Sequence, residues 1–201
     1  MLSHVDEPDR TPKIYLVRHG ETAWTISGQH TGRTDIALTE RGERDAQELS
    51  ARLRGMTFAK VLTSPLQRAR RTGELAGFGA GAAADADLLE WDYGAYEGRR
   101  TADIEAERPG WHLFEDGCPG GETVEAVGAR ADRVIARARA CAGDVLLFAH
   151  RDIFRVVAAR WLGLAAREGR YFYLATASLS VLGYHHDMDE PVIHLWNDVR
   201  H

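Results

Sequence analysis

The chain has 201 residues, which suits one domain with a sizeable core, and its 44% hydrophobic and 27% charged residues are ordinary globular usage rather than a disordered or fibrous bias. A formal net charge of −5 argues against a domain-wide surface for nucleic acid or anionic lipid. Two cysteines are too few for a disulfide scaffold, and the first residues are too polar for a signal peptide. No apolar run approaches the roughly 18 residues of a membrane span. We therefore expect a soluble cytoplasmic protein that binds neither nucleic acid nor membranes.

The first part of the chain alternates strand and helix patterns after a polar N-terminal arm over residues 1–13. Residues 14–17 form a continuous β-rich apolar run, which is typical of a strand buried on both faces. Residues 39–54 carry apolar positions at helical spacing, with Thr39 placed to cap the start of the helix. A second short strand is predicted over residues 61–63.

A further helix is predicted directly after that strand, with Ser64 as its N-cap, Pro65 in its first turn and Arg68 close behind. The Gly/Ala-rich stretch 77–86 is expected to be a connector. Residues 122–140 again place apolar side chains on one face of a helix.

The last third of the chain completes this alternation. Residues 145–149 predict another buried strand, a helix follows His150, and the runs 178–184 and 192–196 predict two final strands. Alternating strands and helices favour a three-layer α/β/α sandwich with a mainly parallel central sheet. Because no long linker or internal repeat divides the chain, we expect a single domain over residues 14–201.

Polar side chains follow the predicted strands at three points, carrying Arg18 and His19, then Arg68, then His150. Ligands of open α/β sheets bind beyond the carboxyl ends of the strands, so two imidazoles and two guanidiniums are expected to converge on one crevice. Such a pocket binds an anion and contains a nucleophile. It fits phosphoryl transfer from a monoester, because cations stabilise the non-bridging oxygens while a neutral imidazole attacks phosphorus and forms a phosphohistidine.

Two further requirements of that chemistry can be examined in the sequence. Adjacent strand residues face opposite sides of a sheet, so Arg18 and His19 reach one pocket only if the chain leaves the strand there, and Gly20 permits such a bend. The leaving group needs a proton, and Glu90 in the stretch 89–98 is the predicted general acid. A nearby phosphate dianion disfavours the charged form of a carboxyl group and keeps it protonated.

An ordered set of short motifs resembles one known family. The run Leu16-Val17-Arg18-His19-Gly20-Glu21-Thr22 closely resembles the signature of the histidine phosphatase superfamily, the phosphoglycerate mutase-like proteins. Further matches follow in the right order, over residues 31–35, 38–39, 64–72, 90–98, 120–122 and 148–150. The resemblance covers nearly the whole chain after Lys13 and implies a phosphoglycerate mutase-like fold. Within the family, the stretches that look most like the acid phosphatase and sedoheptulose-bisphosphatase branch are residues 90–98, 116–123 and 184–191.

The resemblance implies a role for each residue of the predicted pocket. His19 is the phosphorylated nucleophile and Glu90 is the proton donor. The transferring phosphate is bound by Arg18, Arg68 and His150. No metal ion or other cofactor is required.

The resemblance also indicates which residues contact the substrate. Thr31 and Gly32 match positions that usually line the substrate side. Independently of the resemblance, the aromatics Trp91, Tyr93 and Tyr96 either pack in the core or cover the leaving group, and Tyr93 is the predicted contact among them. Two further substrate-binding candidates depart from the family pattern. Thr25 stands where mutases usually carry Asn after the tryptophan, and Arg151 stands where Gly usually follows the second histidine. Arg151 either narrows the pocket or contacts a second phosphate.

We therefore predict a metal-independent phosphatase that acts on a small phosphate ester. A mutase that returns the phosphate to another hydroxyl stays open, as does a non-catalytic phosphate-binding regulatory protein, although binding alone would need neither nucleophile nor acid. No metal site is predicted at His185 and His186, because adjacent histidines on a strand point apart. The sequence leaves a homodimer open.

Overall fold

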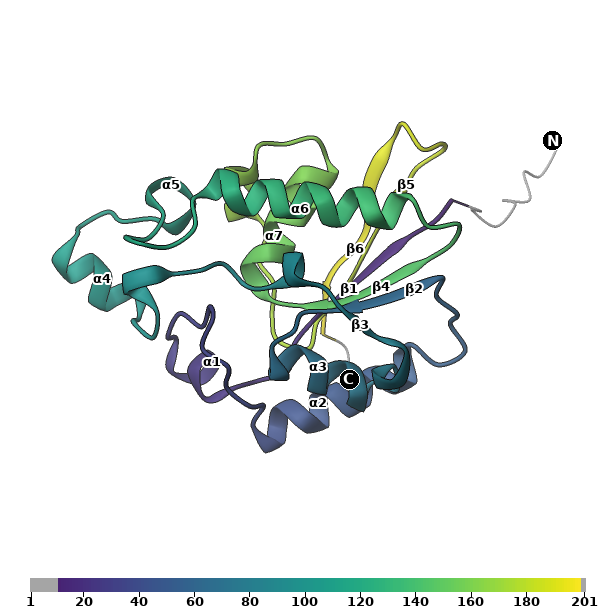
Figure 1. The fold of residues 1–201 in the computed structure, drawn as a ribbon, viewed down its shortest axis with the longest axis horizontal. Coiled ribbons are helices and arrows are strands. Elements are labelled where there is room, and N and C mark those ends of the chain that lie inside the picture. Colours follow the sequence, from purple (N-terminus) through teal and green to yellow (C-terminus); the bar gives the residue numbers. More distant parts are fainter. Residues whose placement is uncertain (1–10, 200–201) are drawn as a thin grey trace, which may run out of the picture.

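The computed structural model describes residues 11–199, so residues 1–10 of the predicted arm lie outside the described residues. Its centre is a six-stranded sheet with the order β3-β2-β4-β1-β5-β6 (Figure 1). The strands are β1 (Ile14–Arg18), β2 (Lys60–Thr63), β3 (Ala83–Ala84), β4 (Val145–Ala149), β5 (Leu179–Tyr184) and β6 (Pro191–Asp198). Strands β3, β2, β4 and β1 are parallel, while β5 pairs antiparallel with β1 and β6 antiparallel with β5. The predicted mainly parallel sheet is confirmed.

Helices cover both faces of this sheet (Figure 1). They are α1 (Ala23–Ser27), α2 (Glu40–Arg52), α3 (Gln67–Leu75), α4 (Thr101–Glu107), α5 (Leu113–Asp116), α6 (Val124–Arg139) and α7 (Arg151–Trp161). Short 3₁₀ turns lie between them: η1 (Gly79–Gly81), η2 (Ala86–Leu88), η3 (Gly94–Tyr96) and η4 (Ala166–Tyr171). Helices α6 and α7 lie on one side of the sheet, and α2 and α3 lie on the other.

Strand β4 explains why two helical layers form. All of its residues are buried, and alternate side chains of a strand point to opposite faces. Val145, Leu147 and Ala149 pack with buried residues of α6 and α7. Leu146 and Phe148 pack with residues of α2 and the end of α3. A strand that is apolar on both faces therefore needs a helix layer on each side, and the predicted three-layer sandwich is confirmed.

Helix starts are only partly as predicted. Helix α2 begins after Thr39, whose hydroxyl accepts a hydrogen bond from the Gly42 amide at 3.0 Å, as the sequence indicates. The prediction that Ser64 caps the next helix is wrong, because α3 begins at Gln67 with Leu66 as a cap that makes no side-chain bond. The Ser64 hydroxyl instead lies 2.7 Å from Nε2 of His150. A tertiary contact with a predicted site residue therefore replaces the expected local cap.

Two parts of the chain differ from expectation because their elements are too short to give a clear periodic pattern of apolar residues. The predicted connector 77–86 contains the two-residue edge strand β3, which pairs with β2. Helices α1, α4 and α5 were not predicted, and at 5, 7 and 4 residues they are too short to show a clear helical period.

The turn after β1 sets the position of the site. Strand β1 ends at Arg18, although the His19 amide still donates to the Ala149 carbonyl oxygen of β4 at 3.0 Å. Gly20 is needed for close packing rather than for a left-handed bend, because its φ is not positive and a Cβ atom there would lie 2.4 Å from the Gly42 carbonyl oxygen. Its amide donates to the Thr72 hydroxyl at 3.1 Å, which ties the turn to α3.

Candidate active site

A cavity of about 290 Å³ opens beyond the carboxyl ends of β1 and β4. Seven of the predicted site residues line it: Arg18, His19, Thr25, Thr31, Glu90, Tyr93 and Arg151. The other three, Gly32, Arg68 and His150, are not part of its wall and lie behind it. The volume is near the lower end of the range for small-molecule pockets, roughly 300 Å³, so the cavity suits a small ligand.

His19 presents a neutral ring with one nitrogen fixed. Its Nδ1 lies 2.8 Å from the Gly20 carbonyl oxygen, and because a carbonyl only accepts, Nδ1 carries the proton and Nε2 keeps its lone pair. The side chain is buried. Burial, together with the charges of Arg18 and Arg68, holds the pKa of His19 well below its usual value. The ring is therefore neutral at physiological pH, with a lone pair on Nε2.

Arg18 lies beside His19 on the cavity wall. Its Nη1 donates to the Leu174 carbonyl at 2.6 Å, while its buried Nε has no hydrogen-bond partner among the described residues. Burial and the neighbouring charge of Arg151 lower the pKa of Arg18 to about 10, so the guanidinium remains charged at neutral pH. A buried cation with an unsatisfied donor suits a bound anion.

Arg68 and His150 form the layer behind His19. The rings of His19 and His150 have centroids 5.2 Å apart. Arg68 Nε donates to His150 Nδ1 at 3.2 Å, so the His150 proton lies on Nε2, which donates to the Ser64 hydroxyl at 2.7 Å. Burial and the Arg68 charge hold the pKa of His150 well below its usual value. Both side chains are fully buried, and neither lines the cavity.

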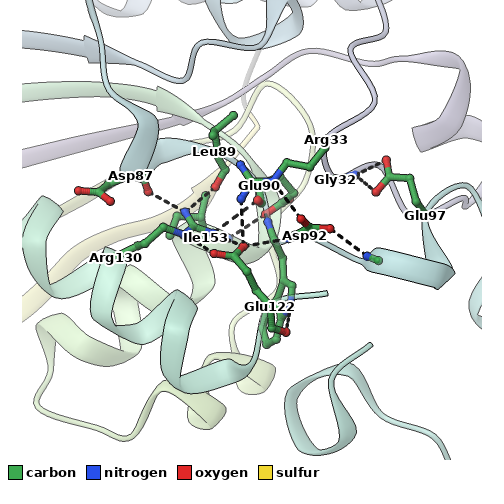
Figure 2. Close-up of polar contacts among 12 residues, drawn as sticks. Gly32, Arg33, Asp87, Leu89, Glu90, Asp92, Glu97, Glu122, Arg130 and Ile153 are labelled. Carbon is green, nitrogen blue, oxygen red and sulfur yellow. Dashed lines mark hydrogen bonds and ion pairs between the residues drawn. The ribbon is translucent and has the colours of Figure 1, made fainter. Parts of the chain in front are cut away.

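Gly32 acts through its backbone. Arg68 donates to the carbonyl oxygens of Thr31, Gly32 and Thr34, at 3.1, 2.9 and 2.9 Å. The carboxylate of Glu97 holds the other side of this turn, because it accepts from the Gly32 amide at 2.9 Å (Figure 2) and from the Thr34 amide at 3.1 Å. A Cβ atom on Gly32 would lie 2.5 Å from the Trp91 carbonyl oxygen, so only glycine fits.

Glu90 places its carboxyl group at the start of α7. Its Oε1 accepts from the backbone amides of Trp91 at 2.9 Å and Ile153 at 3.0 Å, and its Oε2 from that of Asp152 at 3.1 Å. Burial, together with the charge of Asp152, raises the pKa of Glu90 above its usual value, although the amide bonds act against this. A raised pKa in a cavity wall is what a proton donor requires.

Arg130 holds the loop that carries Glu90 (Figure 2). This buried α6 side chain donates from Nη1 to the carbonyl oxygens of Asp87 and Leu89, each at 2.8 Å. Its Nε and Nη2 pair with the two carboxylate oxygens of Glu122, also at 2.8 Å each. One guanidinium therefore fixes the backbone just before Glu90 and ties it to α6.

Glu122 holds the same loop just after Glu90. Its Oε2 accepts from the Asp92 amide at 3.0 Å, and its own amide donates to the Asp92 carbonyl at 2.9 Å. Its backbone carbonyl accepts from the Trp91 indole at 2.9 Å. Arg130 therefore holds the backbone before Glu90 and Glu122 holds the backbone after it, and these two residues form the clamp around residues 87–92.

Tyr93 contacts a residue that the sequence interpretation left without a role. Its hydroxyl donates to Oδ2 of Asp152 at 2.6 Å, and Asp152 is fully buried. Burial would raise the pKa of Asp152, but the charges of Arg151 and Arg155 outweigh it and hold the pKa well below its usual value. The carboxylate is therefore a fixed negative charge beside the cavity. Its place in the polar run directly after a buried strand was a signal that could have identified it.

Other parts of the cavity wall were also missed. His30 is buried, with its ring centroid 4.7 Å from that of Tyr93, and it directly precedes the Thr31 motif. Residues 173–176 line the cavity as well, and the Leu174 carbonyl accepts from Arg18. No local signal marks this segment, because only the fold brings it to the end of β1.

His185, His186 and Glu190 lie together on the β5–β6 hairpin, with ligand atoms within 4.8 Å of one another. The two rings are 3.8 Å apart by their centroids. The argument that adjacent histidines point apart is therefore wrong here, because both residues follow the end of β5 and are not in extended strand. All three side chains are exposed, and the expectation of no metal site stays a prediction.

Comparisons with known proteins identify the family of this chain. The model of the histidine phosphatase superfamily (branch 1) matches residues 14–199. An acid phosphatase of Mycobacterium tuberculosis is 40% identical over 182 residues, covering 88% of this chain and 89% of that protein. A sedoheptulose 1,7-bisphosphatase of Saccharomyces cerevisiae is 31% identical, covering 94% and 93%. The solved structure of an open reading frame product of Mycobacterium tuberculosis has a TM-score of 0.87 and 35% identity, covering 92% of this chain and 97% of that one.

The family model and the phosphatases among the relatives identify a phosphoric monoester hydrolase of the α/β/α class, and the chain belongs to the histidine phosphatase superfamily. The resemblance noted in the sequence is confirmed. Within residues 11–199, none of the helices combines the length and the apolar character that a membrane crossing requires.

Proposed function

We propose that this enzyme hydrolyses small phosphomonoesters through a phosphohistidine at His19, without a metal ion. The observation that carries the proposal is the His19 tautomer. Because Nδ1 donates to the Gly20 carbonyl at 2.8 Å, the lone pair of Nε2 is free to attack phosphorus. Charge for the non-bridging oxygens comes from Arg18 on the cavity wall and from Arg68, whose buried guanidinium charge also acts on His19.

In the first step, Nε2 of His19 forms a bond to phosphorus as the ester oxygen leaves. The proton of the Glu90 carboxyl group passes to the leaving alkoxide, so the product is an alcohol and Glu90 becomes a carboxylate. The phosphorylated ring is cationic, and the Gly20 carbonyl stabilises the Nδ1 proton.

In the second step, water attacks phosphorus and loses a proton to the Glu90 carboxylate. The phosphorus–nitrogen bond breaks, its electron pair returns to Nε2, and inorganic phosphate leaves. His19 is then neutral and Glu90 is again a carboxylic acid. The cycle balances with one ester and one water, without any cofactor.

A single-turnover trap tests this mechanism. The enzyme is mixed with radiolabelled para-nitrophenyl phosphate, quenched in alkali, and the protein is analysed for label that acid releases. We expect such label on the wild type, none on His19→Ala, and wild-type labelling of His186→Ala, whose exposed histidine lies on the β5–β6 hairpin. Absence of label on the wild type during turnover, or label on His19→Ala, rejects the phosphohistidine.

Product analysis separates the remaining candidates. Release of inorganic phosphate that persists in a chelator supports the metal-independent phosphatase. Isomerised ester without inorganic phosphate favours the mutase. Binding of inorganic phosphate without turnover of any ester favours the non-catalytic phosphate-binding protein.

A further inference from the structure

Arg151 lies on the cavity wall, and within the described part of the chain only one edge of its guanidinium makes hydrogen bonds to the protein. Its Nε and Nη2 donate to the two carboxylate oxygens of Asp152, each at 3.2 Å. Among the described residues, Nη1 has no hydrogen-bond partner, and the side chain is 39% exposed. The guanidinium is therefore held in one orientation by a buried carboxylate, with three of its five N–H groups left for a ligand.

Asp152 has hydrogen-bond partners besides Arg151. Arg155 already donates to its Oδ1 at 2.7 Å, and Tyr93 donates to its Oδ2 at 2.6 Å. Both oxygens are thus satisfied by shorter hydrogen bonds than those from Arg151. Asp152 therefore positions Arg151 as well as being neutralised by it.

We infer that Arg151 forms a subsite for a second anionic group, so that the preferred esters carry a carboxylate or a second phosphate on the leaving group. This inference rests on the proposed function and names its substrate class. A planar guanidinium pairs with either anion through parallel hydrogen bonds, which a neutral hydroxyl cannot match. The transferring phosphate already has a cation in Arg18, the residue next to the nucleophile, so the Arg151 edge is available to the remainder of the substrate.

Matched esters test the inference. The short set is ethylene glycol monophosphate, phosphoglycolate and ethylene glycol bisphosphate, which share a two-carbon body and differ in the second group. The long set is a hexose monophosphate, phosphogluconate and a hexose bisphosphate. We expect the wild type to favour at least one anionic ester over its neutral counterpart by about tenfold to a hundredfold in kcat/KM. The carboxylate and phosphate arms show which anion the subsite takes.

Variants of Arg151 assign that preference to its guanidinium. Arg151→Gln is expected to lower kcat/KM for all the esters. The loss is expected to be about tenfold or more larger for the anionic esters than for the neutral ones, so that the preference for anionic esters disappears. Arg151→Lys keeps the charge without the planar fork and is expected to retain part of the preference. Arg41→Gln, which removes an exposed α2 arginine, is the matched control and is expected to retain all of it.

The outcomes separate this inference from the function on which it rests. The subsite is overturned if the wild type shows no preference for anionic esters in either set, or if the preference survives in folded Arg151→Gln. In both cases, hydrolysis of the neutral esters still upholds the phosphatase. No phosphate release from any ester, with no label on His19, rejects the phosphatase itself and with it the subsite. Circular dichroism and thermal unfolding establish that each variant is folded.

Discussion

The two sides of the cavity are built differently. The reacting side is buried: His19 and Glu90 are 4% and 3% exposed, and Arg68 and His150 are fully covered. Each polar group there is fixed by hydrogen bonds to backbone or to another side chain. The outer rim is open, and Tyr173 is 73% exposed. The sheet and its helices thus hold the buried side chains in place, while the rim is formed by exposed side chains such as that of Tyr173.

The largest expected effect tests whether the buried side supplies a proton. Glu90→Gln keeps the carbonyl oxygen that can accept the α7 amides but removes the acid, so kcat for alkyl phosphates is expected to fall by about 10²- to 10⁴-fold. For para-nitrophenyl phosphate the first step is expected to slow much less, because nitrophenolate leaves without a proton. Stopped-flow release of nitrophenol measures this step.

The second step is expected to remain slow in the same variant, because water loses its general base. A rapid burst of nitrophenol followed by slow phosphate release, with label accumulating on His19, is the expected pattern. Equal slowing for the alkyl and nitrophenyl esters would contradict the role of Glu90 as the acid.

The next effect tests whether the buried side depends on the clamp around the Glu90 loop. Arg130→Ala leaves the Glu122 carboxylate and the carbonyls of Asp87 and Leu89 without their donor. The free energy of unfolding is expected to fall by about 3 kcal/mol, measured by urea denaturation. We expect kcat to fall as well, because the Glu90 carboxyl group is no longer held in one place.

Arg133→Ala is the matched control for this clamp, one turn further along α6. Arg133 also contacts Asp87, but through the carboxylate rather than the backbone carbonyl, and the Arg133 side chain is 54% exposed. We expect no measurable change in the urea midpoint and kcat within about twofold of wild type. If the two variants behave alike, the clamp does not position Glu90.

A third effect, of intermediate size, concerns the pH dependence of stability. His19 and His150 have lowered pKa values in the folded state, so their contribution is present above the unfolded pKa of about 6.5 and is lost as the pH falls. Each adds a slope of up to about 1.4 kcal/mol per pH unit below that value. His150→Asn is expected to reduce the slope measured by urea denaturation in phosphate-free buffer, and an unchanged slope would contradict the buried neutral ring.

Glu90 acts in the opposite sense. Its folded pKa is raised, so its contribution is present below the unfolded pKa of about 4.3 and is lost as the pH rises through the folded value. Glu90→Gln removes this opposing effect and is expected to steepen the acid side of the stability profile. The same sign predicts that activity declines on the alkaline side, where Glu90 loses the proton it must donate.

The parts of the molecule that the sequence predicts well are those with a repeating pattern. The apolar run of β4 and the capped amphipathic α2 are decided by local chemistry, and the structure agrees with them. The short α1 and α5 carry no such period. The start of α3 was misjudged because Ser64 was assigned to a cap, while the fold uses its hydroxyl for His150.

The site divides in the same way. Residues next to strand ends, such as His19 and Arg151, are predictable because the sheet places them. Arg130 is not, because a guanidinium in the middle of a helix resembles a solvated charge until the loop carrying Glu90 is seen to lie against it. Segment 173–176 reaches the cavity only because β5 pairs antiparallel with β1, which no local pattern in the sequence specifies.

The smallest expected effect concerns the rim. Tyr173 uses its backbone carbonyl to accept from the Trp196 indole at 2.7 Å, and this bond survives in Tyr173→Ala. Because the ring itself is largely in solvent, the free energy of unfolding is expected to change by less than about 0.5 kcal/mol. The ring is nevertheless part of the cavity wall, so the ratio of kcat/KM for aryl and alkyl phosphates is expected to shift by about threefold against the aryl ester. A large loss of stability with unchanged selectivity would instead make Tyr173 part of the framework and remove the distinction between the two sides.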